Sequence, residues 1–283
     1  MNEHKNFLPT ETFPICKINI GLYVTRKRED GYHDLETVFY PIPLHDNLSI
    51  APLKMSDAPY RLQVAGRSIE ADAADNLIVK VYEQLRADFP LPPLDIYLYK
   101  RIPMGAGLGG GSSDAAAMMR LLNDTFALGL TTEEMERRVA RLGADCAFFI
   151  KGEPAFATGI GDLLSPISLS LKGYVLVLVK PDIFVSTREA YGGITPRQPA
   201  YPLREALAGP MEEWRHTVGN DFETNVFRAH PEIAAIKETL YEMGATYAAM
   251  SGSGSTVYGL FTRRQDSLEE VFPDCFTYQS LLR

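Results

Sequence analysis

A glycine-rich segment, PMGAGLGGGSSDAAA at residues 103–117, offers the clearest chemistry in this chain. Its five glycines let the backbone turn several N–H groups toward one point and approach an anion closely. A helix is predicted to follow, and its first turn adds unpaired N–H groups and the positive end of the helix dipole. Ser112 and Ser113 can either cap that helix or donate hydrogen bonds to phosphate oxygens. The segment therefore predicts a phosphate-binding loop.

Two well-known phosphate loops do not fit this segment. The spacing Gly105-x-Gly107-x-x-Gly110 matches the dinucleotide fingerprint, but that motif needs a second parallel strand with an acidic residue about 20 positions later. Two helical patterns follow here instead. A P-loop ends in Gly-Lys-Ser/Thr, and residues 103–113 contain no lysine. A flexible linker is the remaining alternative, but this loop lies between a predicted strand and an amphipathic helix.

Two charged residues elsewhere could take part in catalysis, and each has a simpler alternative. Lys17 lies in a stretch, residues 15–24, that alternates as a strand does. Its apolar face carries Ile18, Ile20, Leu22 and Val24, and its other face Lys17, Asn19, Gly21 and Tyr23. On local sequence alone Lys17 is more often a solvated strand lysine. Asp145 follows Gly143-Ala144 and could simply cap a short helix.

Two further motifs could contact ligands. Tyr32 and His33 follow the predicted turn at Asp30-Gly31. They are either exposed turn residues without a ligand or a binding site that offers an aromatic face and a polar edge to a base. The SGSGS turn at residues 251–255 predicts either a tight hairpin or a second backbone surface that faces phosphates.

Regular elements must position these residues. Asp75 is the predicted N-cap of a helix that carries Leu77, Ile78, Val81 and Leu85 on one side. Strand 94–100 runs into the glycine loop, and the helix after the loop is predicted to end at Gly129. Thr131 to Glu134 reads as a capping box that opens a helix through Leu142, with Gly143 as its stop. The other predicted strands, 38–42, 47–51 and 61–66, indicate a mostly antiparallel sheet.

The C-terminal part shows strands and helices separated by glycine and proline. It contains a strand at 174–180, a helical stripe of Ile233, Ile236, Leu240 and Met243 closed by Gly244, and two strands around the SGSGS turn. We place a domain boundary near residue 160, which predicts an N-terminal domain at 1–160 and a C-terminal domain at 161–283.

Composition narrows the functional class. The 283 residues carry a formal net charge of −8, so bulk charge gives no basic footprint for nucleic acid. Three widely spaced cysteines, Cys16, Cys146 and Cys275, predict reduced thiols in a cytoplasmic protein. The N-terminus has no secretory pattern, and the longest apolar run, 174–179, is too short to span a bilayer. The five histidines show no metal-ligand spacing, so no protein metal ligand is predicted.

The glycine loop resembles the P-x-x-x-G-L-G-S-S motif of the galactokinase, homoserine kinase, mevalonate kinase and phosphomevalonate kinase (GHMP) superfamily. Its longer form, GLGGGSS, is similar to the branch of this superfamily that acts on a cytidylated sugar alcohol. Three other segments carry the same resemblance. They are CKINIGLYVTRKREDGYHDLETVF, LGADCAFFIKG and MSGSGST, which occur in the family's order and, with the loop, span residues 15–256. Cys16 in place of a usual alanine and Ala106 in place of a common glycine are small departures.

The resemblance implies an α+β, two-domain GHMP kinase fold, with an N-terminal ribosomal-protein-S5-domain-2-like domain, a C-terminal ferredoxin-like domain, and ATP and substrate between them. It assigns Lys17 and Asp145 as the catalytic pair. Cofactor-binding positions would be Asn76, Lys100, Pro103, Met104, Gly105, Ala106, Gly107, Leu108, Gly109, Gly110, Gly111, Ser112 and Ser113. Substrate-binding positions would be Asn19, Tyr32, His33, Thr187 and Tyr191, with Phe184 as a competitor of Tyr191 for the second face of the cytosine.

The implied reaction moves the γ-phosphoryl group of ATP to the 2-hydroxyl of 4-diphosphocytidyl-2-C-methyl-D-erythritol in the non-mevalonate isoprenoid pathway, with Mg²⁺ bridging the ATP phosphates. One rival is a superfamily kinase that acts on homoserine or mevalonate, against which the Gly-Tyr-His motif and the extra glycines argue. A second is a non-catalytic nucleotide-binding regulator, disfavoured by Lys17 and Asp145. A nucleic-acid binder on the same fold is disfavoured by the acidic composition.

Overall fold

The computed structural model describes residues 7–54, 58–67 and 73–283. The first six residues, part of the segment inspected for a secretory signal, lie outside this range. The described chain forms two compact units. The first contains residues up to Cys16, Leu44–Met104 and Gly109–Glu153, and the second contains Lys17–Pro43, Gly105–Leu108 and Pro154–Arg283. Neither unit is continuous in sequence, and the predicted boundary at residue 160 stays a prediction.

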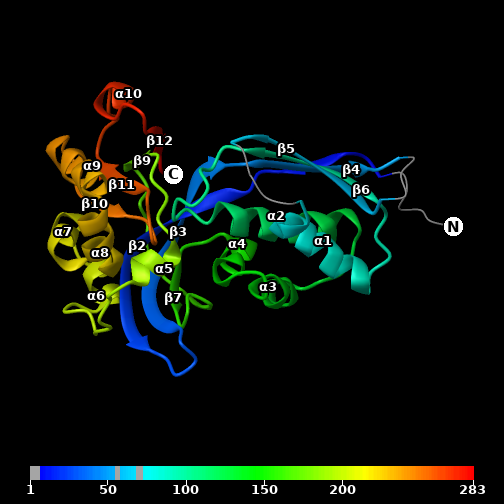
Figure 1. Cartoon of the computed structure of the whole chain (residues 1–283), viewed down its shortest axis with the longest axis horizontal. Coiled ribbons are helices and arrows are strands. Elements are labelled where there is room, and N and C mark those ends of the chain that lie inside the picture. The colour runs from blue at the N-terminus through cyan, green and yellow to red at the C-terminus, as the bar shows by residue number, and fades with distance from the viewer. Residues whose placement is uncertain (1–6, 55–57, 68–72) are drawn as a thin grey trace. The chain divides into compact units, whose positions relative to one another are not determined.

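The first unit is built on a four-stranded sheet in the order β1-β4-β6-β5 (Figure 1). The strands are β1 (Thr10–Thr12), β4 (Asn47–Pro52), β5 (Tyr60–Gly66) and β6 (Leu94–Lys100). Only the β5–β6 pairing is parallel, so the predicted mostly antiparallel sheet is confirmed for this unit. Along β6 the side chains alternate, which buries Leu94, Ile96, Leu98 and also Lys100.

Helices pack beneath this sheet. They are α1 (Leu77–Asp88), α2 (Gly110–Thr125), α3 (Thr132–Ala140) and α4 (Phe148–Lys151), with short 3-10 turns η2 (Ala73–Asp75) and η3 (Ala144–Cys146). In Figure 1, α1 and α2 lie side by side along one face of the sheet, and they contact each other.

The capping box predicted at Thr131 is confirmed, because Thr131 Oγ1 accepts from Glu134 N and Glu134 Oε2 accepts from Thr131 N.

The second unit contains two four-stranded sheets, ordered β2-β3-β7-β8 and β10-β11-β9-β12. The strands of the first are β2 (Ile15–Lys27), β3 (His33–His45), β7 (Ala155–Thr158) and β8 (Leu163–Pro166). Those of the second are β9 (Val175–Lys180), β10 (Tyr247–Met250), β11 (Val257–Phe261) and β12 (Phe276–Leu281). The strand, turn and strand predicted around SGSGS are confirmed by the antiparallel pairing of β10 with β11.

Short helices complete the second unit. They are α5 (Thr187–Tyr191), α6 (Leu203–Ala208), η4 (Met211–Glu213), α7 (Trp214–Thr217), α8 (Asp221–Ala229), α9 (Pro231–Glu242) and α10 (Leu268–Val271). The predicted stripe of α9 is confirmed, with Ile233, Ile236 and Leu240 buried and Gly244 beyond the C-cap at φ 93°. In Figure 1 this helix lies against the β9–β12 sheet, where it contacts β10 and β11.

Three predicted helix boundaries are wrong. The N-cap of α1 is Asn76 rather than Asp75, because Asn76 Oδ1 accepts from Ile78 N at 3.0 Å. Helix α2 ends at Thr125, before Gly129, since the Asn123 side chain accepts from the backbone N–H of Leu130 and ties the chain into a turn. Helix α3 ends at Ala140 rather than Leu142.

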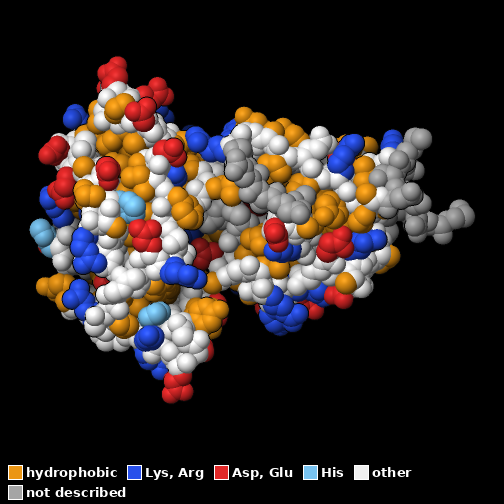
Figure 2. Space-filling model, viewed as in Figure 1, with side chains coloured by type: hydrophobic (Ala, Val, Ile, Leu, Met, Phe, Trp, Pro, Cys, Tyr) orange, Lys and Arg blue, Asp and Glu red, His pale blue; other side chains and the backbone are white. Residues whose placement is uncertain are grey.

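Acidic and basic side chains are intermixed over the described residues of the face shown in Figure 2. None of the helices in the described chain has the length and apolar character that a bilayer crossing requires.

Candidate active site

The glycine loop connects β6 to α2, as predicted, but α2 begins at Gly110. Gly109 is the N-cap, in a left-handed conformation at φ 70°, and it provides no side-chain cap. Ser112 and Ser113 therefore lie inside the first helical turn, so their predicted capping role is wrong. The first N–H groups of α2 have no capping side chain, which suits them to bind an anion.

The loop alternates between anchored and accessible residues. Pro103, Ala106 and Leu108 are buried, whereas Met104 and Gly105 are exposed. Gly105 and Gly107 both have positive φ, at 56° and 73°. Small and apolar side chains thus hold the loop while glycines leave its main chain open.

The middle of the loop is bonded to the third glycine motif. The Ser251 hydroxyl donates to the Gly107 carbonyl at 2.9 Å, and Thr256 N donates to the Ala106 carbonyl at 3.4 Å. A Cβ added to Gly107 would lie 1.9 Å from the Ser251 carbonyl oxygen. Only glycine fits here, because the approach is backbone to backbone. The SGSGS turn is therefore a hairpin that also supports the loop, and its contact with phosphates stays a prediction.

Lys17 is a buried residue of this loop network rather than a solvated strand lysine. The residue is 3% exposed, and Nζ donates to Asn19 Oδ1 at 2.6 Å and to the Gly107 carbonyl at 3.0 Å. The Lys17 backbone N–H also donates to the Leu108 carbonyl at 3.0 Å. The ammonium lies 5.1 Å from the ring centroid of Phe39. Lys17 therefore ties β2 to the loop through both its main chain and its side chain.

Asn19 extends this network, as its predicted place beside Lys17 suggested. Asn19 Nδ2 donates to Thr37 Oγ1 at 3.0 Å, and the Thr37 hydroxyl donates to the Gly21 carbonyl at 2.5 Å. Thr37 is 1% exposed and was missed in the sequence analysis, since nothing local marks a threonine on β3 as a partner of β2.

A second residue that sequence analysis missed is Asn220. Its Nδ2 donates to the carbonyls of Met250 and Gly252 at 2.8 and 2.9 Å, while its Oδ1 accepts from Phe222 N at the start of α8. A single buried amide thus caps α8 and holds the beginning of the SGSGS turn. The signal for this role was only a helix-capping residue after a glycine.

Asp145 lies within η3, in the first unit. The N-caps of η3 and α4 are Gly143 and Ala147, so Asp145 occupies neither cap position. Its neighbour Cys146 is buried, which raises the pKa of that thiol to about 11 although the Ser112 hydroxyl lowers it. This contact brings η3 to the first turn of α2. The predicted pairing of Asp145 with Lys17, a residue of the second unit, stays a prediction.

Apart from Asn19, the predicted substrate residues come from two segments of the second unit. The rings of His33 and Tyr191 stack, with centroids 4.9 Å apart and planes 27° apart. Tyr191 also meets Phe222 edge to face, and Tyr32 is 61% exposed in the preceding turn. Phe184 is 72% exposed and lies against Gly105, whose added Cβ would be 2.8 Å from its ring. Thr187 is the first residue of α5, after the N-cap Ser186. The structure therefore brings His33 together with Tyr191.

The residues predicted near adenosine have clear structural partners in the first unit. Asn76 caps α1, as described above. Lys100 is 2% exposed, and its ammonium contacts the carboxylates of Asp46 and Asp114. Burial alone would lower the pKa of Lys100, but these two carboxylates outweigh it and raise the pKa.

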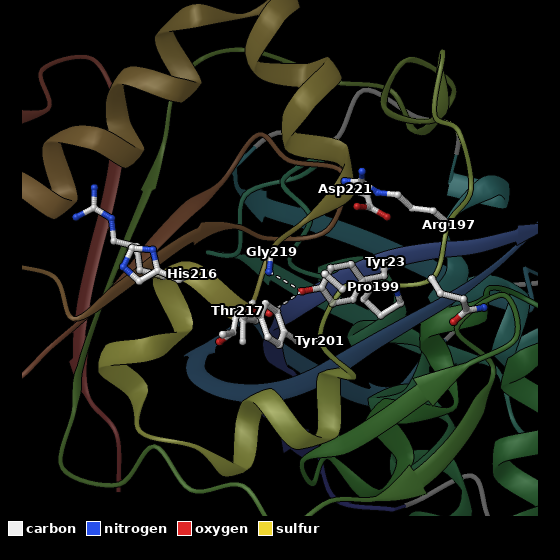
Figure 3. A pocket seen from close by; sticks show the side chains of 12 residues that line it. Tyr23, Arg197, Pro199, Tyr201, His216, Thr217, Gly219 and Asp221 are labelled. Carbon is white, nitrogen blue, oxygen red and sulfur yellow. Dashed lines mark hydrogen bonds between the residues drawn. The ribbon is translucent and has the colours of Figure 1, made fainter.

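A separate pocket of about 350 Å³ lies in the second unit (Figure 3). The Tyr23 hydroxyl on its wall donates to the Thr217 carbonyl and accepts from Gly219 N, and Arg197 lies beside Asp221. Burial raises the pKa of Asp221, while the backbone N–H of Val24 and the charge of Arg197 lower it. The lining contains no residue of the predicted kinase site.

Two protein-family models identify the class of protein to which this fold belongs. The model for the GHMP kinases N terminal domain matches residues 76–153, and that for the GHMP kinases C terminal domain matches residues 203–274. The chain is also similar in fold to L. major mevalonate kinase, with a TM-score of 0.65 over 98% of this chain and 99% of that one, at 18% identity.

Relatives of higher sequence identity identify one family within the GHMP kinases. A Bacteroides fragilis protein named 4-diphosphocytidyl-2-C-methyl-D-erythritol kinase is 54% identical over 272 residues, which covers 96% of this chain and 99% of the relative. A protein of the same name from Parabacteroides distasonis is 49% identical, with 95% and 98% covered. A crystal structure of 4-(cytidine 5'-diphospho)-2C-methyl-D-erythritol kinase matches with a TM-score of 0.80 at 30% identity, over 95% of this chain and 98% of that one. The chain belongs to the 4-diphosphocytidyl-2-C-methyl-D-erythritol kinase family of GHMP kinases, and the predicted α+β GHMP kinase fold is confirmed.

Proposed function

We propose that this chain transfers the γ-phosphoryl group of ATP to the 2-hydroxyl of 4-diphosphocytidyl-2-C-methyl-D-erythritol, a step in isoprenoid precursor synthesis. Relatives with this kinase name match almost the whole chain at about half identity. The observation that carries the proposal is the bonding of Lys17 to the Gly107 carbonyl, because it joins a buried cation to a loop rich in open main-chain amides.

The loop and α2 supply the nucleotide site in this proposal. Residues 103–113 hold the ATP phosphates through backbone N–H groups and through the positive end of α2, with Asn76 and Lys100 nearer the adenosine. No lysine inside the loop is needed, since the amides and the helix dipole provide the positive potential.

Phosphoryl transfer requires mainly precise positioning and neutralised charge. Asp145 orients the acceptor hydroxyl and takes its proton once bonding to phosphorus has made that hydroxyl more acidic. Lys17 counters negative charge on the moving phosphoryl group. Asn19 fixes the Lys17 ammonium through the 2.6 Å hydrogen bond, so it acts as a positioning residue as well as a predicted substrate contact.

The cytidine end of the acceptor binds in this proposal at Tyr32, His33 and Tyr191, with Thr187 near the reacting hydroxyl. The His33–Tyr191 stack provides a flat aromatic surface with polar edges, which suits a pyrimidine. It favours Tyr191 over Phe184 as the aromatic residue at the base, because Phe184 lies instead against the glycine loop.

Magnesium is expected to enter with ATP. Mg²⁺ in kinase sites usually keeps several water ligands and is bound through the substrate phosphates rather than by an all-protein cage. When bound, the ion neutralises charge on the phosphates. We assign no protein ligand to it.

We also propose that the enzyme works in the cytoplasm without nucleic acid or a membrane as partner. The three cysteines lie far apart in the sequence and form no paired motif, which suits a reducing compartment, and the net charge of −8 gives no basic footprint for nucleic acid.

The decisive experiment measures ADP release with ATP and either the cytidylated acceptor or the uncytidylated methylerythritol phosphate. We expect turnover only with the cytidylated compound. Homoserine and mevalonate serve as the acceptors of rival superfamily kinases. Turnover on either of these, or no ADP release with any acceptor, would contradict the proposal.

The role of Asp145 is tested separately with Asp145→Asn. We expect loss of at least 100-fold in kcat, with ATP affinity measured by calorimetry close to that of wild type. Asp162→Asn, a change at an exposed carboxylate, is the matched control. Near-normal turnover in Asp145→Asn would show that the carboxylate has another function.

A further inference from the structure

Three charged side chains, all within the first unit, form a buried cluster at the two ends of the glycine loop. Asp46 lies between β3 and β4, Lys100 ends β6, and Asp114 lies in the early part of α2. Their side chains are 0%, 2% and 4% exposed. The Lys100 ammonium contacts the Asp46 carboxylate and lies 2.7 Å from Asp114 Oδ2. One cation is therefore shared by two carboxylates with almost no access to solvent.

Asp46 holds the chain where it enters the loop. Its Oδ1 accepts from the backbone N–H groups of Arg101 and Ile102 at 2.5 and 2.8 Å, directly before Pro103. Its own N–H donates to the Pro14 carbonyl at 2.9 Å, which fixes Asp46 in turn. One carboxylate thus binds the ammonium with one oxygen and the entering backbone with the other.

Asp114 holds the chain where it leaves the loop. It lies in helix α2, which begins at Gly110, and its Oδ2 accepts from the Lys100 ammonium. The entering and leaving chains are also packed tightly, because a Cβ added to Gly110 would lie 2.9 Å from Ile102 Cγ2 and 3.5 Å from Lys100 Nζ. Entry and exit of the loop are therefore fixed to each other through one ammonium group.

Stability alone is a poor explanation for this cluster. Replacing a buried ion pair by apolar residues is often neutral or stabilising, because burying charges costs desolvation energy. Here the carboxylates also outnumber the cation, and Asp114 Oδ1 is buried with no hydrogen-bond partner among the residues that the structure describes. Such a cluster is better explained by the geometry that it imposes.

We infer that Asp46 and Asp114 are positioning residues that, through Lys100, fix the two ends of the glycine loop in the spacing that nucleotide binding requires. The inference rests on the proposed function, since it takes the loop as the ATP site. Neither residue contacts the nucleotide in this scheme. They act on affinity for ATP by restricting the conformations of the loop that lies between them.

The test uses Asp46→Asn and Asp114→Asn in the full chain, with the dissociation constant of a non-hydrolysable ATP analogue measured by calorimetry. We expect each variant to bind the analogue at least 10-fold more weakly, and the KM of the acceptor to stay within twofold of wild type. The control is Asp95→Asn, which removes a carboxylate of β6 that pairs with the exposed Arg61. It is expected to change neither constant.

A double variant gives a second readout. Because both carboxylates act through the same ammonium, we expect Asp46→Asn combined with Asp114→Asn to weaken binding little more than the stronger single change. The same changes combined with Asp95→Asn are expected to be additive. Hydrogen exchange in a peptide covering residues 101–112 is expected to be faster in Asp114→Asn, with exchange in α1 unchanged.

These outcomes separate the inference from its premise. If wild type binds the ATP analogue but does not phosphorylate the acceptor, the proposed reaction is wrong. The positioning role is then still decided by the dissociation constants of the variants for the analogue. If both variants fold and bind the analogue within twofold of wild type, the cluster does not position the loop and the inference is overturned. If Asp46→Asn does not fold, Asp114→Asn alone decides by the same criterion.

Discussion

The ammonium group of Lys17 donates a 3.0 Å hydrogen bond to the carbonyl oxygen of Gly107, a residue 90 positions later in the chain. This bond connects β2 with the middle of the glycine loop. It means that a change at Lys17 acts on both the proposed chemistry and the conformation of the loop.

We expect Lys17→Met to lower kcat by about 100- to 1000-fold, as for removal of one group that stabilises transition-state charge. It also leaves Asn19 Oδ1 without its donor, which costs about 1–3 kcal/mol of stability. Steady-state assays and urea denaturation measure the two effects. Lys27→Met, at the exposed end of the same strand, is the control. Equal kcat values for the two variants would remove Lys17 from the mechanism.

Gly107 and Gly129 offer a matched pair for the loop. Their φ values are almost equal, at 73° and 72°, but a Cβ at Gly107 meets the Ser251 carbonyl at 1.9 Å, whereas none of the described atoms lies within 4 Å of a Cβ at Gly129. We expect Gly129→Ala to cost about 1 kcal/mol from backbone strain alone, with ATP affinity unchanged. Gly107→Ala has to displace backbone, so we expect at least 10-fold weaker ATP binding by calorimetry. Similar affinities in both variants would argue against the loop as the nucleotide site.

The stack of His33 on Tyr191 predicts that Tyr191, rather than Phe184, stacks on the cytosine base of the acceptor. Stacking of a base on an aromatic side chain is worth about 1–3 kcal/mol, so Tyr191→Ala is expected to raise the KM of the cytidylated acceptor by about 5- to 150-fold. Tyr191→Phe keeps the ring and is expected to stay within threefold of wild type. Phe184→Ala is the comparison, and it is expected to affect ATP more than the acceptor because Phe184 lies against Gly105. The opposite pattern would assign the base to Phe184.

Asp114 predicts how stability depends on pH. Burial raises the pKa of Asp114 to about 7, the Lys100 ammonium opposes this shift, and Asp46 adds to it. The native state therefore keeps a proton that the unfolded chain has lost above about pH 4, so stability falls as pH rises from about 4 to 7. The Asp114→Asn variant lacks this ionisable group, so its free energy of unfolding does not fall in this way. We expect the free energy of unfolding of the variant minus that of wild type to rise by about 1–3 kcal/mol from pH 5 to pH 8.

Urea denaturation at several pH values measures this difference. Asp95→Asn is again the control, because the Arg61 partner lowers the pKa of Asp95 and its contribution is lost only below the usual carboxyl range. Its stability difference from wild type is expected to be constant between pH 5 and pH 8. Parallel curves for Asp114→Asn and wild type would disprove the ionisation assigned to Asp114.

Local sequence was sufficient for features whose partners are near in the chain. The capping box at Thr131, the glycine loop between β6 and α2, and the turn between β10 and β11 all depend on contacts within a few residues or on glycine geometry. At α1 two adjacent residues, Asp75 and Asn76, are both good N-caps, and only the hydrogen bond to Ile78 N distinguishes them.

Features with distant partners could not be predicted in this way. Lys17 is buried because Gly107 and Asn19 satisfy its ammonium, and a pattern of alternating residues cannot reveal that. Asn220 looks like an ordinary helix cap until its amide is seen to hold Met250 and Gly252. Lys100 and Asp114 are 14 residues apart, and the third member, Asp46, precedes Lys100 by 54, so only the folded chain brings the cluster together.

The second unit combines Lys17–Pro43 with Pro154–Arg283, so its earliest and latest parts are separated by most of the first unit. During synthesis, β2 and the beginning of β3 leave the ribosome long before β7, which pairs with β3 at residues 155–157, has been translated. The growing chain must carry β2 and β3 without β7, and without the C-terminal core residues that bury Leu22 and Val24, while the intervening sequence folds. The second unit can therefore be completed only after nearly the whole chain has been made, which makes nascent β2 and β3 natural segments for a chaperone to protect.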